Sequence, residues 1–208
     1  MSENLSFPGR VRADAVIQCA MDMEAAPLLH LLEPMGDEET PRAVHAGAPG
    51  RHVQRFALGL IDGRTVLVVT SGIGEANAAA ATARALVLVD APIVIAAGTT
   101  GGLARDINVG DIAVGVSAVY GQAGYALGQV PRMPVDYSSS ERAAARCDAL
   151  AGLVDHPVRL GRIVSSDSFC TEQVAEPMRQ RFPDAMGADM ETCAIAQVAW
   201  SCGVDWIS

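Results

Sequence analysis

Aromatic side chains and positive charge are both scarce in this chain of 208 residues. Phenylalanine, tyrosine and tryptophan make up 4% of the residues, although 50% are hydrophobic, so the core must be filled mainly by small aliphatic side chains. The 15 basic residues, all of them arginines, are outnumbered by 24 aspartates and glutamates, which gives a net charge of −9. Nucleic-acid binding requires a basic face, so nucleic acid is not an expected partner. A neutral or cationic small molecule is easier to accommodate.

Cysteine pairs and long apolar runs are also missing. The five cysteines are odd in number and form no C-x-x-C pair, so neither a disulfide framework nor a zinc site is predicted. No run reaches the roughly 18 to 20 apolar residues that span a bilayer, and the N-terminal MSENLSFPGRVRAD lacks the apolar centre of a signal peptide. These absences predict a cytoplasmic protein with reduced thiols and no membrane partner.

The apolar pattern predicts one α/β domain. We expect a flexible N-terminal segment over residues 1–13 and a single domain over residues 14–208, which is long enough to bury a substantial core. Strand and helix patterns alternate imperfectly, and a hairpin is expected where residues 52–61 and 65–70 flank a glycine. This order favours a mixed central sheet flanked by helices over a purely parallel sheet.

Two segments rich in glycine, proline and polar residues interrupt the pattern. Residues 36–50 predict a turn or mobile loop, and residues 121–140 predict a long loop of the kind that often lines a site or an interface. Apolar spacing predicts helices over residues 22–33, 75–89, 141–153, 172–181 and 190–202.

A glycine-rich corner lies between two apolar runs in residues 93–115. The first run ends at Gly98, and Thr99 and Thr100 follow it at the carboxyl edge of the predicted sheet. The two glycines after them let the backbone turn and approach a ligand closely. Ligands of α/β sheets bind at such edges. A tight connection without a ligand fits the same residues, so the segment alone leaves both interpretations open.

Two acidic residues stand where an apolar strand gives way to a helix. Glu24 lies in CAMDMEAAPLL and Glu191 in GADMETCAIA. Each can be a helix-start acid, because a carboxylate there is stabilised by the helix dipole and the free N–H groups. Two carboxylates in one cleft would instead suit cleavage of a glycosidic bond, in which charge develops on a sugar and water must be activated.

Other residues near these carboxylates also have two interpretations. Phe169, one of four phenylalanines, follows a predicted strand and can either stack on a planar base or pack in the core. Met21 and Met190 each neighbour one carboxylate, and they can line an apolar pocket or fill the core. Residues 71–74 can cradle an anion before a helix, but the segment lacks the third glycine of the dinucleotide pattern and the P-loop lysine.

Taken together, four ordered blocks resemble the nucleoside phosphorylase and nucleosidase superfamily, and most closely the 5′-methylthioadenosine/S-adenosylhomocysteine nucleosidases. The resemblance covers about residues 14–208. The blocks are AMDME at 20–24, SGIG at 71–74, GTTGGL at 98–103 with VGD at 109–111, and SDSF at 166–169 leading to DMETCA at 189–194.

This resemblance implies a hydrolase that splits 5′-methylthioadenosine or S-adenosylhomocysteine into adenine and a thioribose. Glu24 aligns with the carboxylate that activates the attacking water, and Glu191 with the one that binds the ribose hydroxyls and stabilises the cationic sugar. Met21 and Ile73 align with residues that border the apolar 5′-alkylthio pocket. The resemblance implies no metal or organic cofactor, and it implies a homodimer.

The remaining substrate contacts also come from the resemblance. Met190 matches the methionine beneath the ribose, and Phe169 matches the aromatic ring stacked on adenine. Cys170 lies where the backbone reads the adenine edge. Thr99 and Gly101 lie where the glycine corner touches the water and the base.

A phosphate-dependent phosphorylase is the closest alternative, because the corner and the VGD block also look like those of uridine phosphorylase. Phosphorylases place an arginine just before the corner to hold the phosphate dianion. Here Ala96 and Ala97 occupy those places, so the bidentate donor is missing and water is the expected nucleophile.

Three departures from the family pattern stand out. Only residues 121–123 separate Tyr120 from a glycine-tyrosine pair, where relatives carry a longer segment that serves the dimer and the 5′ pocket. The sequence stops at Ser208, before the Ser-Asp pair whose aspartate protonates adenine in relatives, so we expect part of an active enzyme. The alternative is a non-catalytic nucleoside-binding homologue. The third departure is mild: two positions before the ribose-binding glutamate, where relatives carry their usual acid, this chain has Asp189.

Overall fold

The computed structural model describes residues 7, 11–48, 50–122 and 136–208. Its larger sheet has six strands in the order β13-β7-β2-β5-β4-β3. The first four are mutually parallel, and β4 and β3 are antiparallel additions at one edge. The strands are β2 (Ala15–Cys19), β3 (Arg42–Ala46), β4 (Gln54–Ile61), β5 (Arg64–Thr70), β7 (Ile93–Ala96) and β13 (Asp205–Ile207).

A second sheet has five strands in the order β10-β9-β11-β12-β8. Its three central strands are parallel, and both edge strands are antiparallel to their neighbours. Gly115 on β9 and Ser208, just after β13, exchange two backbone hydrogen bonds of 2.7 and 3.0 Å, which join the two sheets. The strands are β8 (Gly101–Gly102), β9 (Ile112–Tyr120), β10 (Asp136–Ser138), β11 (Val158–Ser165) and β12 (Ala185–Asp189).

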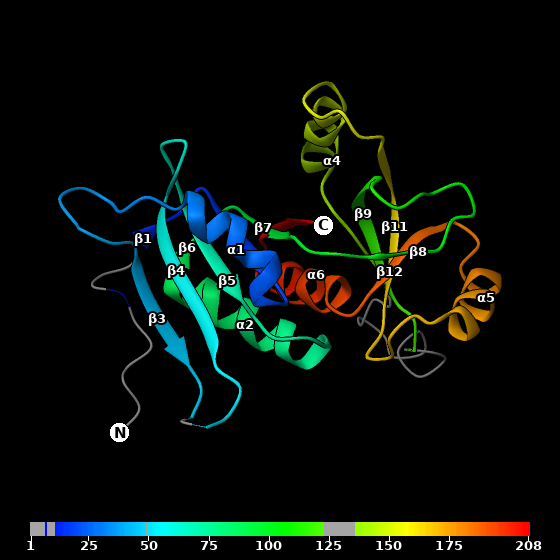
Figure 1. Cartoon of the computed structure of the whole chain (residues 1–208), viewed down its shortest axis with the longest axis horizontal. Helices are drawn as coiled ribbons and strands as arrows, with labels where there is room; N and C mark the ends of the chain where they lie inside the picture. Colours follow the sequence, from blue (N-terminus) through cyan, green and yellow to red (C-terminus); the bar gives the residue numbers. More distant parts are fainter. Residues whose placement is uncertain (1–6, 8–10, 49, 123–135) are drawn as a thin grey trace.

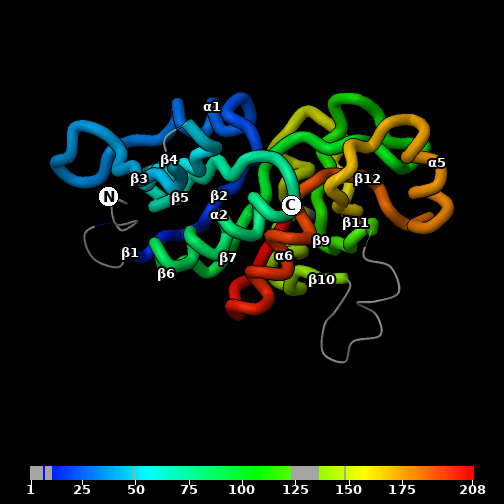
Figure 2. The backbone as a smooth tube through the Cα atoms, turned by 90° about the horizontal axis from the view of Figure 1, so that it is seen from below, coloured from blue at the N-terminus to red at the C-terminus, as the bar shows by residue number. Residues whose placement is uncertain are grey.

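Helices cover both faces of the six-stranded sheet (Figures 1 and 2). The side chains of β5 show why both faces are covered, because they alternate between two buried clusters, one on each face of the sheet. Val66 and Val68 pack with Ala25 of α1, whereas Leu67 and Val69 pack with the alanines of α2 and with α6. The helices are α1 (Asp22–Leu31), α2 (Glu75–Leu88), α4 (Glu141–Asp148), α5 (Glu172–Arg181) and α6 (Thr192–Ser201), and a 3₁₀ turn covers Ala149–Gly152.

The predicted α/β fold with a mixed sheet is confirmed. For four of the five predicted helices, each predicted end lies within two residues of the observed end. The helix expected over 141–153 instead ends at Asp148, where the 3₁₀ turn follows. No described helix is long and apolar enough to cross a membrane.

The structure corrects three expectations about irregular segments. The predicted loop over residues 36–50 contains β3, which pairs along its whole length with β4. The predicted loop over residues 121–140 contains β10, and its residues 123–135 lie outside the described part of the chain. The N-terminal segment expected to be flexible is ordered at its end, because Val11–Arg12 forms β1 and pairs in parallel with β6 (Val89–Asp90).

Candidate active site

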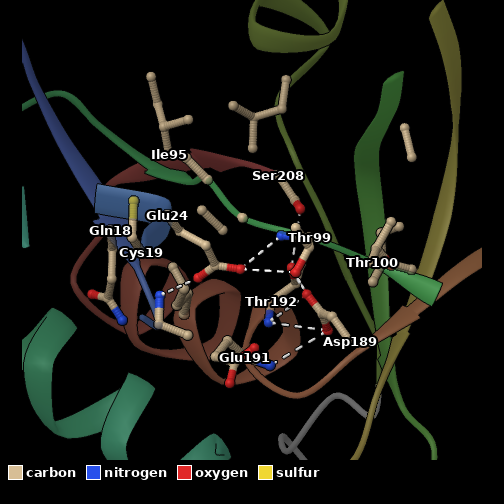
Figure 3. Close-up of a pocket in the computed structure, with 18 of the residues that line it drawn as sticks. Gln18, Cys19, Glu24, Ile95, Thr99, Thr100, Asp189, Glu191, Thr192 and Ser208 are labelled. Carbon is tan, nitrogen blue, oxygen red and sulfur yellow. Dashed lines mark hydrogen bonds between the residues drawn. The ribbon is translucent and has the colours of Figure 1, made fainter. Parts of the chain in front are cut away.

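Glu24 is held at the carboxyl edge of the six-stranded sheet. It follows β2 by one short turn and lies in the first turn of α1. Its Oε2 accepts hydrogen bonds from the backbone N–H groups of Ala20 and Met21 at 3.1 and 3.0 Å. Its Oε1 accepts from both the N–H and the hydroxyl of Thr99, each at 2.9 Å (Figure 3). The helix-start interpretation therefore accounts for one carboxylate oxygen only, and the glycine corner holds the other.

Gly98 allows this close approach between the corner and α1. A methyl group added at Gly98 would lie 2.9 Å from Glu24 Oε1 and 3.1 Å from its carboxyl carbon. Carbon and oxygen atoms do not pack that closely without displacement, so any larger residue would push the carboxylate out of place. Gly98, the first glycine of the corner, is therefore needed for the observed position of the Glu24 carboxylate.

Glu191 approaches the same region from the five-stranded sheet. It is the N-cap residue of α6, just after β12. Its Oε1 accepts a 2.7 Å hydrogen bond from the N–H of Gly74, at the start of α2. Burial raises the pKa of Glu191, the Gly74 N–H opposes that shift, and the charges of Asp189 and Glu24 add to it.

Both carboxylates line one cleft of about 320 Å³. All nine residues singled out in the sequence lie along it, namely Met21, Glu24, Ile73, Thr99, Gly101, Phe169, Cys170, Met190 and Glu191. They come from five separate parts of the chain. Glu24 and Thr99 follow strands of the six-stranded sheet, whereas Phe169 and Glu191 follow strands of the five-stranded sheet, so the cleft lies where the carboxyl ends of both sheets meet. The structure therefore brings together every residue of the predicted set.

Apolar side chains form the open rim of this cleft. Phe169 is 77% exposed, which excludes the core-packing interpretation of this residue. Ile73 is 51% exposed on the facing side. Exposed ring and aliphatic surface at a cleft is suited to contact with a planar or apolar ligand.

A second cavity of about 390 Å³ adjoins the cleft (Figure 3). The two share Ala20, Glu24, Thr99, Thr100, Asp189 and Glu191. None of the described residues that line either space carries a positive charge. In the described part of the chain, no group of three histidines, cysteines or acidic residues is arranged to hold a metal ion.

Two residues outside the predicted set also organise the site. Asp189 is a buried carboxyl that accepts hydrogen bonds from Ser165 Oγ and from the backbone and hydroxyl of Thr192. Thr100 donates its hydroxyl to the carbonyl oxygen of Ala188 at 2.9 Å. In the sequence, Asp189 was recognisable only as the family's usual acid two positions before Glu191. Thr192 is close to it in sequence, but Ser165 is 24 residues away, so local spacing does not reveal that contact.

Comparisons with known proteins agree with this arrangement. The family model described as "Phosphorylase superfamily" matches residues 14–208. A 5′-methylthioadenosine/S-adenosylhomocysteine nucleosidase of Staphylococcus carnosus is 34% identical over 159 residues, covering 74% of this chain and 70% of that protein. One from Anoxybacillus flavithermus is 36% identical over 159 residues, covering 73% of this chain and 68% of that protein.

Solved structures show the same likeness. The nucleosidase of Neisseria meningitidis in complex with methylthio-immucillin-A has a TM-score of 0.77 and 29% identity, over 93% of this chain and 82% of that one. The nucleosidase of Colwellia psychrerythraea in complex with adenine has a TM-score of 0.77 and 28% identity, over 96% of this chain and 81% of that one. The chain therefore belongs to the phosphorylase superfamily and, within it, to the 5′-methylthioadenosine/S-adenosylhomocysteine nucleosidase family.

Proposed function

We propose that this protein hydrolyses the N-glycosidic bond of 5′-methylthioadenosine or S-adenosylhomocysteine and releases adenine and a thioribose. The observation that carries the proposal is that Glu24 and Glu191, from opposite sheets, line one cleft with an exposed aromatic ring at its rim. Cleavage of a glycosidic bond needs a base for the incoming water and negative charge near a sugar that becomes cationic.

Glu24 acts as the base in this proposal. Its carboxylate is fixed by Thr99 and by the start of α1, so it is oriented before any substrate binds. Water attacks C1′ of the ribose and passes a proton to Glu24. The C1′–N9 bond breaks, its electron pair leaves with the base, and the base takes up one proton from solvent to become adenine. A pre-oriented base lowers the barrier because no reorganisation is needed during the reaction.

Glu191 binds the ribose hydroxyls in this proposal. Its Oε1 is anchored by Gly74, and its location beside the cleft leaves carboxylate lone pairs for hydroxyl donors. The same negative charge stabilises the sugar as positive charge develops on it. Met190, the preceding residue, lies beneath the ribose and supplies an apolar surface.

Adenine and the 5′ substituent occupy the remaining surfaces of the cleft. Phe169 stacks on the base, and Gly101 and the backbone of Cys170 lie along its edge. Met21 and Ile73 border the 5′-alkylthio group. The exposure of Phe169 and Ile73 supports this assignment, because a ligand that covers exposed apolar side chains removes their surface from water, which favours binding.

Water, and not phosphate, is the nucleophile in this proposal. A phosphorylase must bind a dianion, which calls for arginine or another strong donor. The described lining of the cleft holds two glutamates and no positive side chain, and Ala96 and Ala97 precede the corner. Phosphate would be repelled by that lining.

We further propose that the protein is cytoplasmic, as its sequence predicts, and that it forms a homodimer, as the family resemblance implies. Sedimentation equilibrium should give twice the mass of one chain. A monomer at micromolar concentration would contradict the dimer without affecting the proposed chemistry.

Identification of the sugar product tests the reaction directly. The full-length protein is purified and incubated with 5′-methylthioadenosine, with and without phosphate, and the products are separated by mass. We expect adenine and 5-methylthioribose at the same rate in both samples. A sugar 1-phosphate that forms only with phosphate would establish a phosphorylase instead.

A further inference from the structure

Glu191 occupies a position at which an acid would ordinarily cap its own helix. It is the N-cap residue of α6, with non-helical backbone angles (φ −138°, ψ −40°), yet its side chain makes no capping hydrogen bond. N-cap side chains usually accept from the N–H groups of the first turn. The carboxylate of Glu191 instead turns to Gly74 and the cleft. Another group must therefore satisfy the start of α6.

Asp189 and Ser165 perform that capping. The N–H of Thr192 donates to Asp189 Oδ2 at 3.2 Å, and the N–H of Cys193 donates to Ser165 Oγ at 2.9 Å. The Ser165 hydroxyl in turn donates to Asp189 Oδ1. The first free N–H groups of the helix thus have partners without any contribution from the Glu191 side chain.

Asp189 also holds the backbone of Glu191 itself. The N–H of Glu191 donates to Asp189 Oδ1 at 3.4 Å, and the Thr192 hydroxyl donates to the other oxygen (Figure 3). The donors to Asp189 come from Ser165 at the end of β11 and from Glu191 and Thr192 at the start of α6. A buried carboxylate with this many donors has one favoured orientation. The junction is therefore rigid where Glu191 projects from it.

We infer that Asp189 is the positioning residue that keeps Glu191 out of the helix cap and directs it to the ribose hydroxyls. This inference rests on the proposed function, in which Glu191 binds those hydroxyls. Without the Asp189 carboxylate, the first-turn N–H groups of α6 lose an acceptor. The Glu191 carboxylate is then the nearest alternative acceptor, and turning to it would take Glu191 away from the sugar.

The appropriate readout is the preference for a ribose over a 2′-deoxyribose substrate. A general loss of structure would lower activity on both substrates and leave that preference unchanged. We would measure kcat/KM of wild type and Asp189→Asn for 5′-methylthioadenosine and for its 2′-deoxy counterpart. An asparagine amide donates on one side and cannot replace both oxygens. The loss of a hydrogen bond to a charged group is worth about 10-fold or more, so the ribose preference should fall by about that factor. Activity on the 2′-deoxy substrate should stay within about 3-fold.

Two further variants keep the test decisive. Thr192→Val removes one donor to Asp189 at nearly constant volume, and it should lower the ribose preference in the same direction even if Asp189→Asn folds poorly. Asp111→Asn is the matched control, since Asp111 is also a largely buried acid, with a side chain 5% exposed, but it pairs with Arg159 and lines neither cavity. Its ribose preference should equal that of wild type.

A double-mutant cycle tests whether Asp189 acts through Glu191. In a Glu191→Gln background, Asp189→Asn should cause no further loss of ribose preference, because the group that it positions is already altered. Equal losses on both substrates, or full additivity with Glu191→Gln, would overturn the inference while the hydrolase proposal stands. A wild-type protein that does not hydrolyse 5′-methylthioadenosine would overturn the proposed function and this inference with it.

Discussion

Replacement of Glu75 by glutamine should stabilise this protein at alkaline pH. Glu75 lies half-buried in the first turn of α2, beside the site. Burial and, after it, the nearby charges of Asp167, Asp189 and Glu191 together raise its pKa from an ordinary 4.5 to about 7. The folded protein therefore binds this proton more tightly than the unfolded chain does.

The sign of the pH dependence follows from that difference. The stabilising contribution of protonated Glu75 is fully present below pH 4.5 and is lost as the pH rises through about 7. At about 1.4 kcal/mol for each tenfold change in proton affinity, the whole shift would correspond to about 3 kcal/mol without solvent screening. Solvent screening of a half-buried group reduces this to about 1 to 2 kcal/mol. Glutamine removes the penalty but also loses about 0.3 to 1 kcal/mol of interaction with the helix dipole.

The net effect at pH 8 should be a gain of about 1 kcal/mol, or about 2 to 4 °C in Tm for a chain of this size. At pH 5 the folded protein holds Glu75 protonated, so the burial penalty is small, no charge interacts with the helix dipole, and the variant should nearly equal wild type. Thermal unfolding of Glu75→Gln and wild type between pH 5 and 8.5 measures both. Glu172→Gln is the matched control, because Glu172 is an exposed acid in the first turn of α5. It should lose a little stability at every pH. A Glu75→Gln gain that shrinks as the pH rises would refute the reasoning.

Two further substitutions test the geometry of the cleft. Gly98→Ala places a methyl group 2.9 Å from Glu24 Oε1, so steady-state assays should show kcat reduced by about 100-fold, and an unchanged kcat would mean that the carboxylate position is not critical. Phe169→Ala should change the free energy of unfolding by less than about 0.5 kcal/mol, because the ring is 77% exposed. Stacking on a base is worth about 1 to 3 kcal/mol, so the same variant should raise the Kd for adenine by about 5-fold or more in calorimetry, and an unaltered Kd would remove Phe169 from the base site.

The positions of the candidate site residues could be predicted because they follow strands. Glu24 comes after β2, Thr99 after β7, Phe169 after β11 and Glu191 after β12. Apolar runs reveal where such strands end, and parallel strands place their carboxyl ends together. The approach of Glu24 to Glu191 could not be predicted in this way, because their strands belong to different sheets, which the backbone hydrogen bonds between Gly115 and Ser208 join.

The missed strands depend on partners that are distant in sequence. Residues 42–46 alternate between half-buried and exposed positions and contain two charged or ionisable side chains, so their composition resembles a loop. They form a strand because β4 offers an unpaired edge. In the same way, β1 exists through pairing with β6, far along the chain. Pairing of this kind is tertiary and leaves little trace in local composition.

The hydrogen-bond network around Asp189 was equally inaccessible to sequence reasoning. Its donors, Ser165 and Thr192, are common polar residues that carry no motif of their own. Only the contacts of these donors at the start of α6 show that Asp189 caps the helix and that Glu191 faces the cleft. Sequence position identified Glu191 as a candidate site residue, but it could not show that Asp189 takes over the capping of α6.

Turnover by Glu24→Gln, compared with Asp22→Asn, tests the central claim most directly. Both acids lie in the first turn of α1, but Asp22 is 68% exposed and pairs with Arg55 at the surface. The account predicts that Glu24→Gln lowers kcat for 5′-methylthioadenosine by about 10² to 10⁴, as expected for loss of a general base, while adenine still binds and the fold is retained. Asp22→Asn should keep wild-type turnover. A Glu24→Gln variant as active as Asp22→Asn would contradict the claim, since Glu24 would then be a helix-start acid alone.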